Sequence, residues 1–195
     1  MENAPPARKP QAARLGWEIL AARHAYESPV NRLRADRLAI PGRGEIEYSY
    51  LERGESVIVV PLLADGRLAL IRQYRYPVDE HCLELPAGGC ADRGGLALEA
   101  VARQELREEI GGTAASFEYA GWFYSSSSLS DEVCHVLLAR GVVLDQPLAH
   151  EPGESLEVVL MPVPEAVALV RRGEMKTGTC ALAILLCERK MEGER

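Results

Sequence analysis

The feature that most constrains the fold is one long helix-forming segment in the middle of the chain, residues 96–110. It contains neither glycine nor proline, is rich in Ala, Leu, Glu and Arg, and stops at Gly111 and Gly112, as a stable helix with a glycine C-terminus does. At about 100° per residue, Leu98, Val101 and Ala102 lie on one face. The segment therefore predicts a helix that packs one face against a core.

Strand-like runs lie on both sides of this helix. Residues 45–50 alternate polar and apolar side chains, which predicts a half-buried strand, and the continuous apolar run at 56–63 predicts a buried one. Asp65 and Gly66 supply a turn into a returning strand at 67–73. Further strands are expected at 82–85, 117–124, 133–139 and 156–161, and further helices at 165–172 and 180–190. This order predicts an α+β or α/β sandwich rather than a doubly wound sheet.

Composition narrows the class of protein. A chain of 195 residues that is 47% apolar suits one globular domain with an appended element, after a disordered tail at residues 1–13. The net charge of −7 argues against a general nucleic-acid partner. No apolar run approaches the roughly 20 residues of a membrane helix, so no membrane partner is expected. The five cysteines are an odd number without a CxxC pair, which predicts reduced thiols and a cytoplasmic location.

Three glutamates in the central helix are the main candidates for functional residues. Glu105, Glu108 and Glu109 fall within one narrow arc and continue the apolar face rather than the solvated one. Like charges at this spacing repel, and desolvation near a core adds to the cost. A divalent cation offsets both effects, and hard oxygen ligands favour Mg²⁺ or Mn²⁺ over zinc. The alternative is an ordinary acidic helix face without a ligand.

The segment from Glu84 to Gly112, ELPAGGCADRGGLALEAVARQELREEIGG, resembles a Nudix box. Residues 17–187 as a whole resemble the ADP-ribose pyrophosphatase branch of the Nudix hydrolases, through RQYRYP at 72–77, ELPAG at 84–88 and SDE at 130–132. The resemblance implies a Nudix-type α/β/α sandwich with a mixed sheet at 55–195. It also implies an N-terminal antiparallel sheet element at 14–54 that forms a homodimer.

The resemblance further implies roles for individual residues. Glu105, Glu108 and Glu109, with the main-chain carbonyl of Ala87, would hold the metal, and Glu108 would also be catalytic. The substrate would be bound by Arg75 at a phosphate, by Tyr48 stacking on the base, by Arg53 nearby and by Glu84. The catalytic base would be Glu154, with Glu151 as the reserve.

The chain departs from the family pattern at several positions. Gln104 stands where the box has arginine, Leu96 where it has its first glutamate, and Cys90 where it has its leading glycine. Ser127 and Ser128 occupy the positions of a Pro-Gly pair. These changes leave three predictions open: hydrolysis of ADP-ribose to a nucleoside monophosphate and a sugar phosphate, hydrolysis of GDP-sugars or other nucleotide sugars, and nucleotide binding without turnover.

Overall fold

The computed structural model describes residues 9–90, 95–147 and 156–192, and these separate into two compact units. The first unit comprises Met1–Gly54 with Tyr124–Glu132, and the second comprises Glu55–Phe123 with Val133–Arg195. None of the helices in the described ranges has the length and hydrophobicity that a bilayer crossing requires.

The first unit is a three-stranded antiparallel sheet with one short helix. In chain order it contains α1 (Pro10–Arg14), β1 (Glu18–Glu27), β2 (Arg32–Ile40) and β3 (Gly44–Glu52), and β2 is the central strand. The strand at 45–50 is confirmed within β3, but its half-buried character is wrong: Tyr50 is buried while residues 45–49 are exposed. Of the tail predicted at 1–13, residues 1–8 lie outside the described residues. Residues 10–13 are helical, because Pro10 begins α1 at a position where its missing N–H costs nothing.

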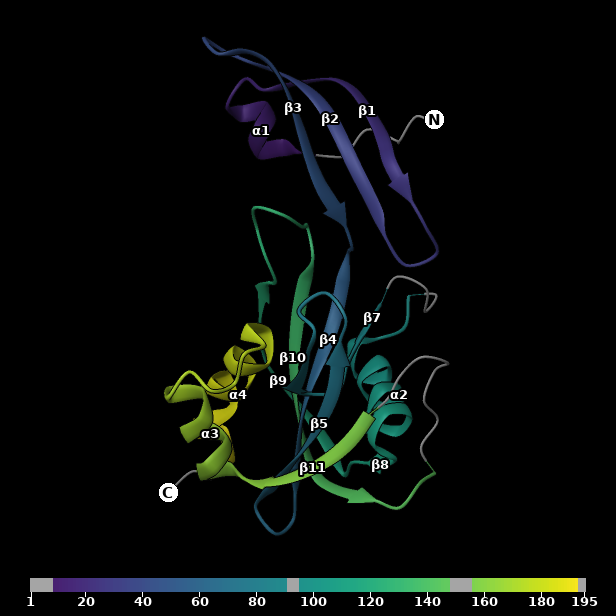
Figure 1. Ribbon diagram of the computed structural model, residues 1–195, viewed down its shortest axis with the longest axis vertical. Helices are drawn as coiled ribbons and strands as arrows, with labels where there is room; N and C mark the ends of the chain where they lie inside the picture. The colour runs from purple at the N-terminus through teal and green to yellow at the C-terminus, as the bar shows by residue number, and fades with distance from the viewer. Residues whose placement is uncertain (1–8, 91–94, 148–155, 193–195) are drawn as a thin grey trace. The chain divides into compact units, whose positions relative to one another are not determined.

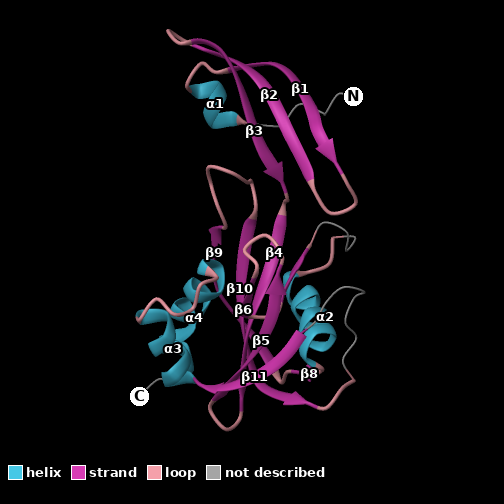
Figure 2. Cartoon of the chain, in the orientation of Figure 1, coloured by secondary structure: helices cyan, strands magenta, loops and turns pink. Residues whose placement is uncertain are grey.

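The second unit is built on an eight-stranded mixed sheet (Figures 1 and 2). Its strands are β4 (Glu55–Leu63), β5 (Arg67–Arg75), β6 (Glu80–Glu84), β7 (Ala87–Gly89), β8 (Gly112–Thr113), β9 (Ser116–Tyr124), β10 (Val133–Leu144) and β11 (Leu156–Pro162). β4 and β10 run parallel, and β11 pairs antiparallel with β5. The helices are α2 (Leu98–Ile110), α3 (Val163–Arg171) and α4 (Gly178–Met191).

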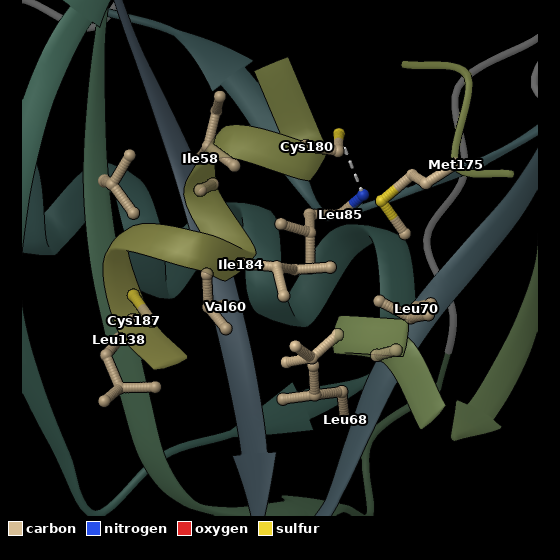
Figure 3. Close-up of a cluster of buried hydrophobic side chains, with 14 of the residues drawn as sticks. Ile58, Val60, Leu68, Leu70, Leu85, Leu138, Met175, Cys180, Ile184 and Cys187 are labelled. Carbon is tan, nitrogen blue, oxygen red and sulfur yellow. Dashed lines mark hydrogen bonds between the residues drawn. The ribbon is translucent and has the colours of Figure 1, made fainter. Parts of the chain in front are cut away.

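The helices cover both faces of this sheet, and β4 shows why. Val57 and Val59 pack in one buried cluster with residues of α2, whereas Ile58 and Val60 pack in another with residues of α3 and α4. Because successive side chains of a strand point to opposite faces, a continuous apolar run is needed where both faces are covered. Figure 3 shows the second cluster, in which α4 supplies Ile184. The predicted α/β/α sandwich is confirmed.

Candidate active site

The acidic residues of α2 lie where the helix continues its buried face. Glu105 and Glu109 are buried, with 4% and 9% of their surface exposed, beside the core residues Leu106 and Ile110. The helix ends at Gly111, whose positive φ of 62° suits a left-handed C-cap. The prediction that carboxylates extend the apolar face of this helix is thus confirmed for Glu105 and Glu109.

The loop before α2 packs its backbone directly against these carboxylates. A Cβ atom added to Gly88 would lie 2.0 Å from Glu105 Oε1, so Glu105 keeps its observed position only while residue 88 is glycine. The Ala87 N–H donates to Glu109 Oε2 at 3.1 Å. β7, which carries both residues, is fixed by pairing with β4, where Ala87 lies opposite Ile58. The sheet therefore positions the loop backbone, and the loop backbone positions the two buried carboxylates.

The third glutamate, Glu108, lies nearer to solvent and has polar neighbours on its own helix. Gln104 Nε2 donates to its Oε1 at 2.9 Å, and Arg107 NH2 lies 3.6 Å from the same oxygen. In the sequence Gln104 is only a departure from the box, whereas in the structure it orients Glu108. Gln104 and Glu108 are four residues apart and so lie one turn apart on the helix, and this spacing could have indicated the contact.

The donor set of this region suits a hard divalent cation. Two buried carboxylates, a third one turn away and a closely packed backbone supply oxygen ligands of the kind Mg²⁺ prefers. Within residues 9–90, 95–147 and 156–192, no three Asp, Glu, His or Cys side chains already converge as a metal-binding group. The hydrogen bond from Gln104 engages only Oε1 of Glu108, and the predicted ligand set, Ala87 included, stays a prediction.

Arg75 at the end of β5 is held by a carboxylate rather than free. Its Nε donates to Glu84 at 3.0 Å, and its NH2 bonds the second carboxylate oxygen. The hydrogen bonds to Glu84 raise the pKa of Arg75, and the charge of Glu109 adds to this effect. Arg75 therefore lies within electrostatic range of the α2 carboxylates, and Glu84 fixes the orientation of its guanidinium.

A cavity of about 550 Å³ opens beside this pair. Its polar lining includes Arg75 and Glu84, both predicted from the sequence, and also Lys176 and Thr177, which no pattern in the sequence indicated. Thr177 Oγ1 donates to Glu84 Oε1 at 3.2 Å. Ninety-three positions separate these two residues in the chain, so no local pattern in the sequence could have shown that they meet.

The remaining predicted residues fall in other parts of the chain. Tyr48 and Arg53 belong to the first unit, where Tyr48 is 39% exposed and its hydroxyl contacts the Ser128 carbonyl at 3.4 Å. Arg53 donates through NH1 to the carbonyl of Val30 at 2.9 Å, so its side chain already stabilises a turn. Glu151 and Glu154 lie outside the described residues.

Comparison with known proteins gives concordant results. The family model of the NUDIX domain matches residues 52–179. The chain is 28% identical to the ADP-ribose pyrophosphatase of Mycobacterium tuberculosis (strain ATCC 25618 / H37Rv), over 87% of this chain and 82% of that protein. It is 27% identical to the ADP-ribose pyrophosphatase of Bacillus subtilis (strain 168), over 86% and 90%. A crystal structure of an ADP compounds hydrolase matches the fold with a TM-score of 0.78 at 20% identity, covering 91% of this chain and 95% of that one.

Proposed function

The chain belongs to the NUDIX domain family, and from that premise we propose that it hydrolyses the diphosphate of ADP-ribose, giving a nucleoside monophosphate and a sugar phosphate. The observation that carries the proposal is the burial of Glu105 and Glu109 against the backbone of Ala87 and Gly88. A carboxylate pair held this tightly is costly to stability without a function that uses its charge. Similarity to two ADP-ribose pyrophosphatases supports the choice of substrate.

Nudix hydrolases generally use divalent metal ions, and we propose Mg²⁺ for this chain, with Mn²⁺ as a substitute. Glu105, Glu108 and Glu109 would hold it together with the carbonyl of Ala87. A bound divalent ion neutralises the diphosphate and lowers the pKa of water. The carboxylates supply the negative charge that keeps such an ion in place.

The residues of this chain have separate tasks in the proposed reaction. Arg75, oriented by Glu84, binds a phosphate oxygen of the substrate and stabilises the charge that develops there. A glutamate of the loop before β11 accepts the proton of the attacking water, with Glu154 as the first choice and Glu151 as the second. Water adds to one phosphorus, the bridging P–O bond breaks, and the bridging oxygen leaves with the other phosphate.

We also propose a homodimer in which Tyr48 and Arg53 of the N-terminal sheet contact the nucleotide. Support comes from the exposure of the Tyr48 ring, which leaves an aromatic face available for stacking on a base. Light scattering tests the oligomeric state, and a rise in KM for the Tyr48→Ala variant tests the contact. A monomer with an unchanged KM would overturn this proposal.

A substrate panel tests the proposed activity. ADP-ribose, GDP-mannose, UDP-glucose, NADH and a diadenosine polyphosphate are each incubated with the protein and Mg²⁺, Mn²⁺ or EDTA, and the phosphate monoester products are quantified. We expect metal-dependent turnover that is fastest with ADP-ribose. Preference for GDP-mannose would move the substrate to the second candidate, GDP-sugars. Saturable binding of ADP-ribose without turnover would contradict the proposal and favour a nucleotide-binding domain.

A further inference from the structure

The cavity beside Arg75 is lined by the Arg75–Glu84 pair and by Lys176 and Thr177 of the segment that precedes α4. Glu84 Oε1 accepts from both Arg75 Nε and Thr177 Oγ1, so these residues lie side by side in its wall. The next strand connects this wall to the α2 carboxylates, because the Ala87 N–H donates to Glu109. A volume of about 550 Å³ falls within the range of about 300–1,000 Å³ that is typical of small-molecule sites. The cavity is therefore large enough to take a substrate group that extends beyond the diphosphate.

Lys176 is exposed, yet the chain on both sides of it is fixed. Met175 before it is buried in the core cluster that packs on α4, with 6% of its surface exposed. Thr177 after it is hydrogen-bonded to the buried carboxylate of Glu84. The backbone at Lys176 is therefore held at the cavity, and only its side chain is free to adjust to a ligand.

Lys176 is a cation at the cavity that has N–H donors available for a ligand. Glu84 accepts hydrogen bonds from Nε and NH2 of Arg75 and holds that guanidinium in place. Lys176 Nζ donates to the carbonyl of Gly173 at 3.1 Å and, within the described part of the chain, forms no ion pair. An ammonium group carries three N–H donors. At least one of them can therefore reach a hydroxyl or phosphate oxygen.

The rest of the lining suits a polyhydroxylated ring rather than a second phosphate. Glu80 is an exposed carboxylate that accepts hydrogen bonds and repels anions. Pro77, Val78 and Cys82 add apolar surface, on which the C–H groups of a sugar can pack. A lysine donor, a carboxylate acceptor and an apolar wall together recognise a group that has hydroxyls and no charge of its own.

We propose that this cavity binds the sugar beyond the second phosphate of the substrate, and that Lys176 is a specificity-determining residue that donates to a sugar hydroxyl. The inference rests on the proposed function, since it assigns a place to the sugar of the same nucleotide. Glu80 accepts from a second hydroxyl, and Thr177 acts only through Glu84, as a positioning residue.

Two substrates that differ only in the sugar test this proposal. ADP-ribose carries the sugar, and the methyl ester of the β-phosphate of ADP keeps the diphosphate without it. We expect Lys176→Met to lower kcat/KM for ADP-ribose about tenfold, mainly through KM, and to leave the methyl ester within about twofold of the wild type. Arg189→Met, which removes an exposed cation from α4 away from the cavity, should change neither.

The outcomes separate this inference from the proposed function. Equal losses on both substrates, or no loss on either, would overturn the role of Lys176 while the activity stands. Absence of wild-type turnover on both would overturn the proposed function. In that event titration calorimetry in EDTA compares the same two ligands: tenfold weaker binding of ADP-ribose alone by Lys176→Met supports the sugar site, and unchanged binding refutes it.

Discussion

β4 contributes side chains to the buried clusters on both faces of the eight-stranded sheet, but the two faces differ in chemistry. On one face, α3 and α4 pack an apolar cluster that contains Ile184, Cys180 and Cys187 (Figure 3). On the other face, the apolar cluster under α2 continues into Glu105 and Glu109. Apolar burial on the first face stabilises the fold. On the second face the desolvation of buried carboxylates offsets part of that stabilisation.

The contrast teaches where a substitution should affect stability and where it should affect activity. On the α4 face Ile184 packs within an apolar cluster, so its truncation should mainly leave a cavity. On the α2 face the backbone positions carboxylates. A displacement of these groups by about an ångström should therefore lower activity before it lowers stability. The following predictions test this division, from the largest effect to the smallest.

Ile184→Ala tests the α4 face. Ile184 is fully buried, so the variant should lose about 2–5 kcal/mol of unfolding free energy, through lost transfer energy and a residual cavity. Chemical denaturation measures that loss, and kcat per folded molecule at low temperature should stay at the wild-type value. Leu182→Ala, at an exposed position of the same helix, is the control and should change stability far less. A large drop in kcat for Ile184→Ala would show that the two faces are coupled.

Gly88→Ala tests the α2 face. The added methyl group would lie 2.0 Å from Glu105 Oε1, so the carboxylate must move, and kcat should fall about a hundredfold, equivalent to about 2.7 kcal/mol. Stability should change by less than about 1 kcal/mol, because a flexible side chain moves aside. Gly89→Ala is the matched control, since nothing lies within 4 Å of its added Cβ. If both variants kept full activity, the position of Glu105 would not matter to the reaction.

Gln104 provides a finer test of the same face. Replacing it with leucine removes the hydrogen bond to Glu108 and should lower kcat about tenfold, or about 1.4 kcal/mol. Gln104→Arg keeps an N–H donor at this position and should retain most of the activity. Steady-state kinetics at saturating Mg²⁺ measure both. Equal kcat values for the leucine and arginine variants would remove Gln104 from the list of orienting residues.

The α4 face should show its own dependence on pH. Burial raises the pKa of Cys187 from 9.0 to about 12 and that of Cys180 likewise to about 12. The unfolded chain releases these protons near pH 9 and the folded chain does not. Stability is therefore complete below pH 9 and is lost as pH rises from 9 to 12, by about 1 kcal/mol per thiol at pH 10.

Urea unfolding at pH 8 and pH 10 checks this prediction. The wild type should lose stability between the two values, and Cys187→Ala should lose about 1 kcal/mol less over the same interval. An identical loss in both proteins would mean that Cys187 takes no part in the pH dependence.

The sequence predicted best what is local. The helix at 96–110 and its acidic arc follow from spacing along one element, and the structure differs only in starting α2 at Leu98. The burial of the strand at 45–50 was wrong, because alternation shows which residues share a face but not whether another element covers that face. The pairing of Glu84 with Thr177 could not be predicted, since it depends on how β6 meets the segment before α4.

The most direct test of the central claim compares Glu108→Gln with Glu99→Gln, two isosteric changes on α2. Glu99 is exposed in the first turn and pairs with Arg103, so its loss costs little. Turnover of ADP-ribose with Mg²⁺ is measured alongside the circular dichroism spectrum and the unfolding midpoint. The account predicts that Glu108→Gln abolishes turnover with an unchanged fold, while Glu99→Gln stays near the wild type. Full activity in Glu108→Gln would contradict the assignment of the α2 carboxylates to metal binding and catalysis.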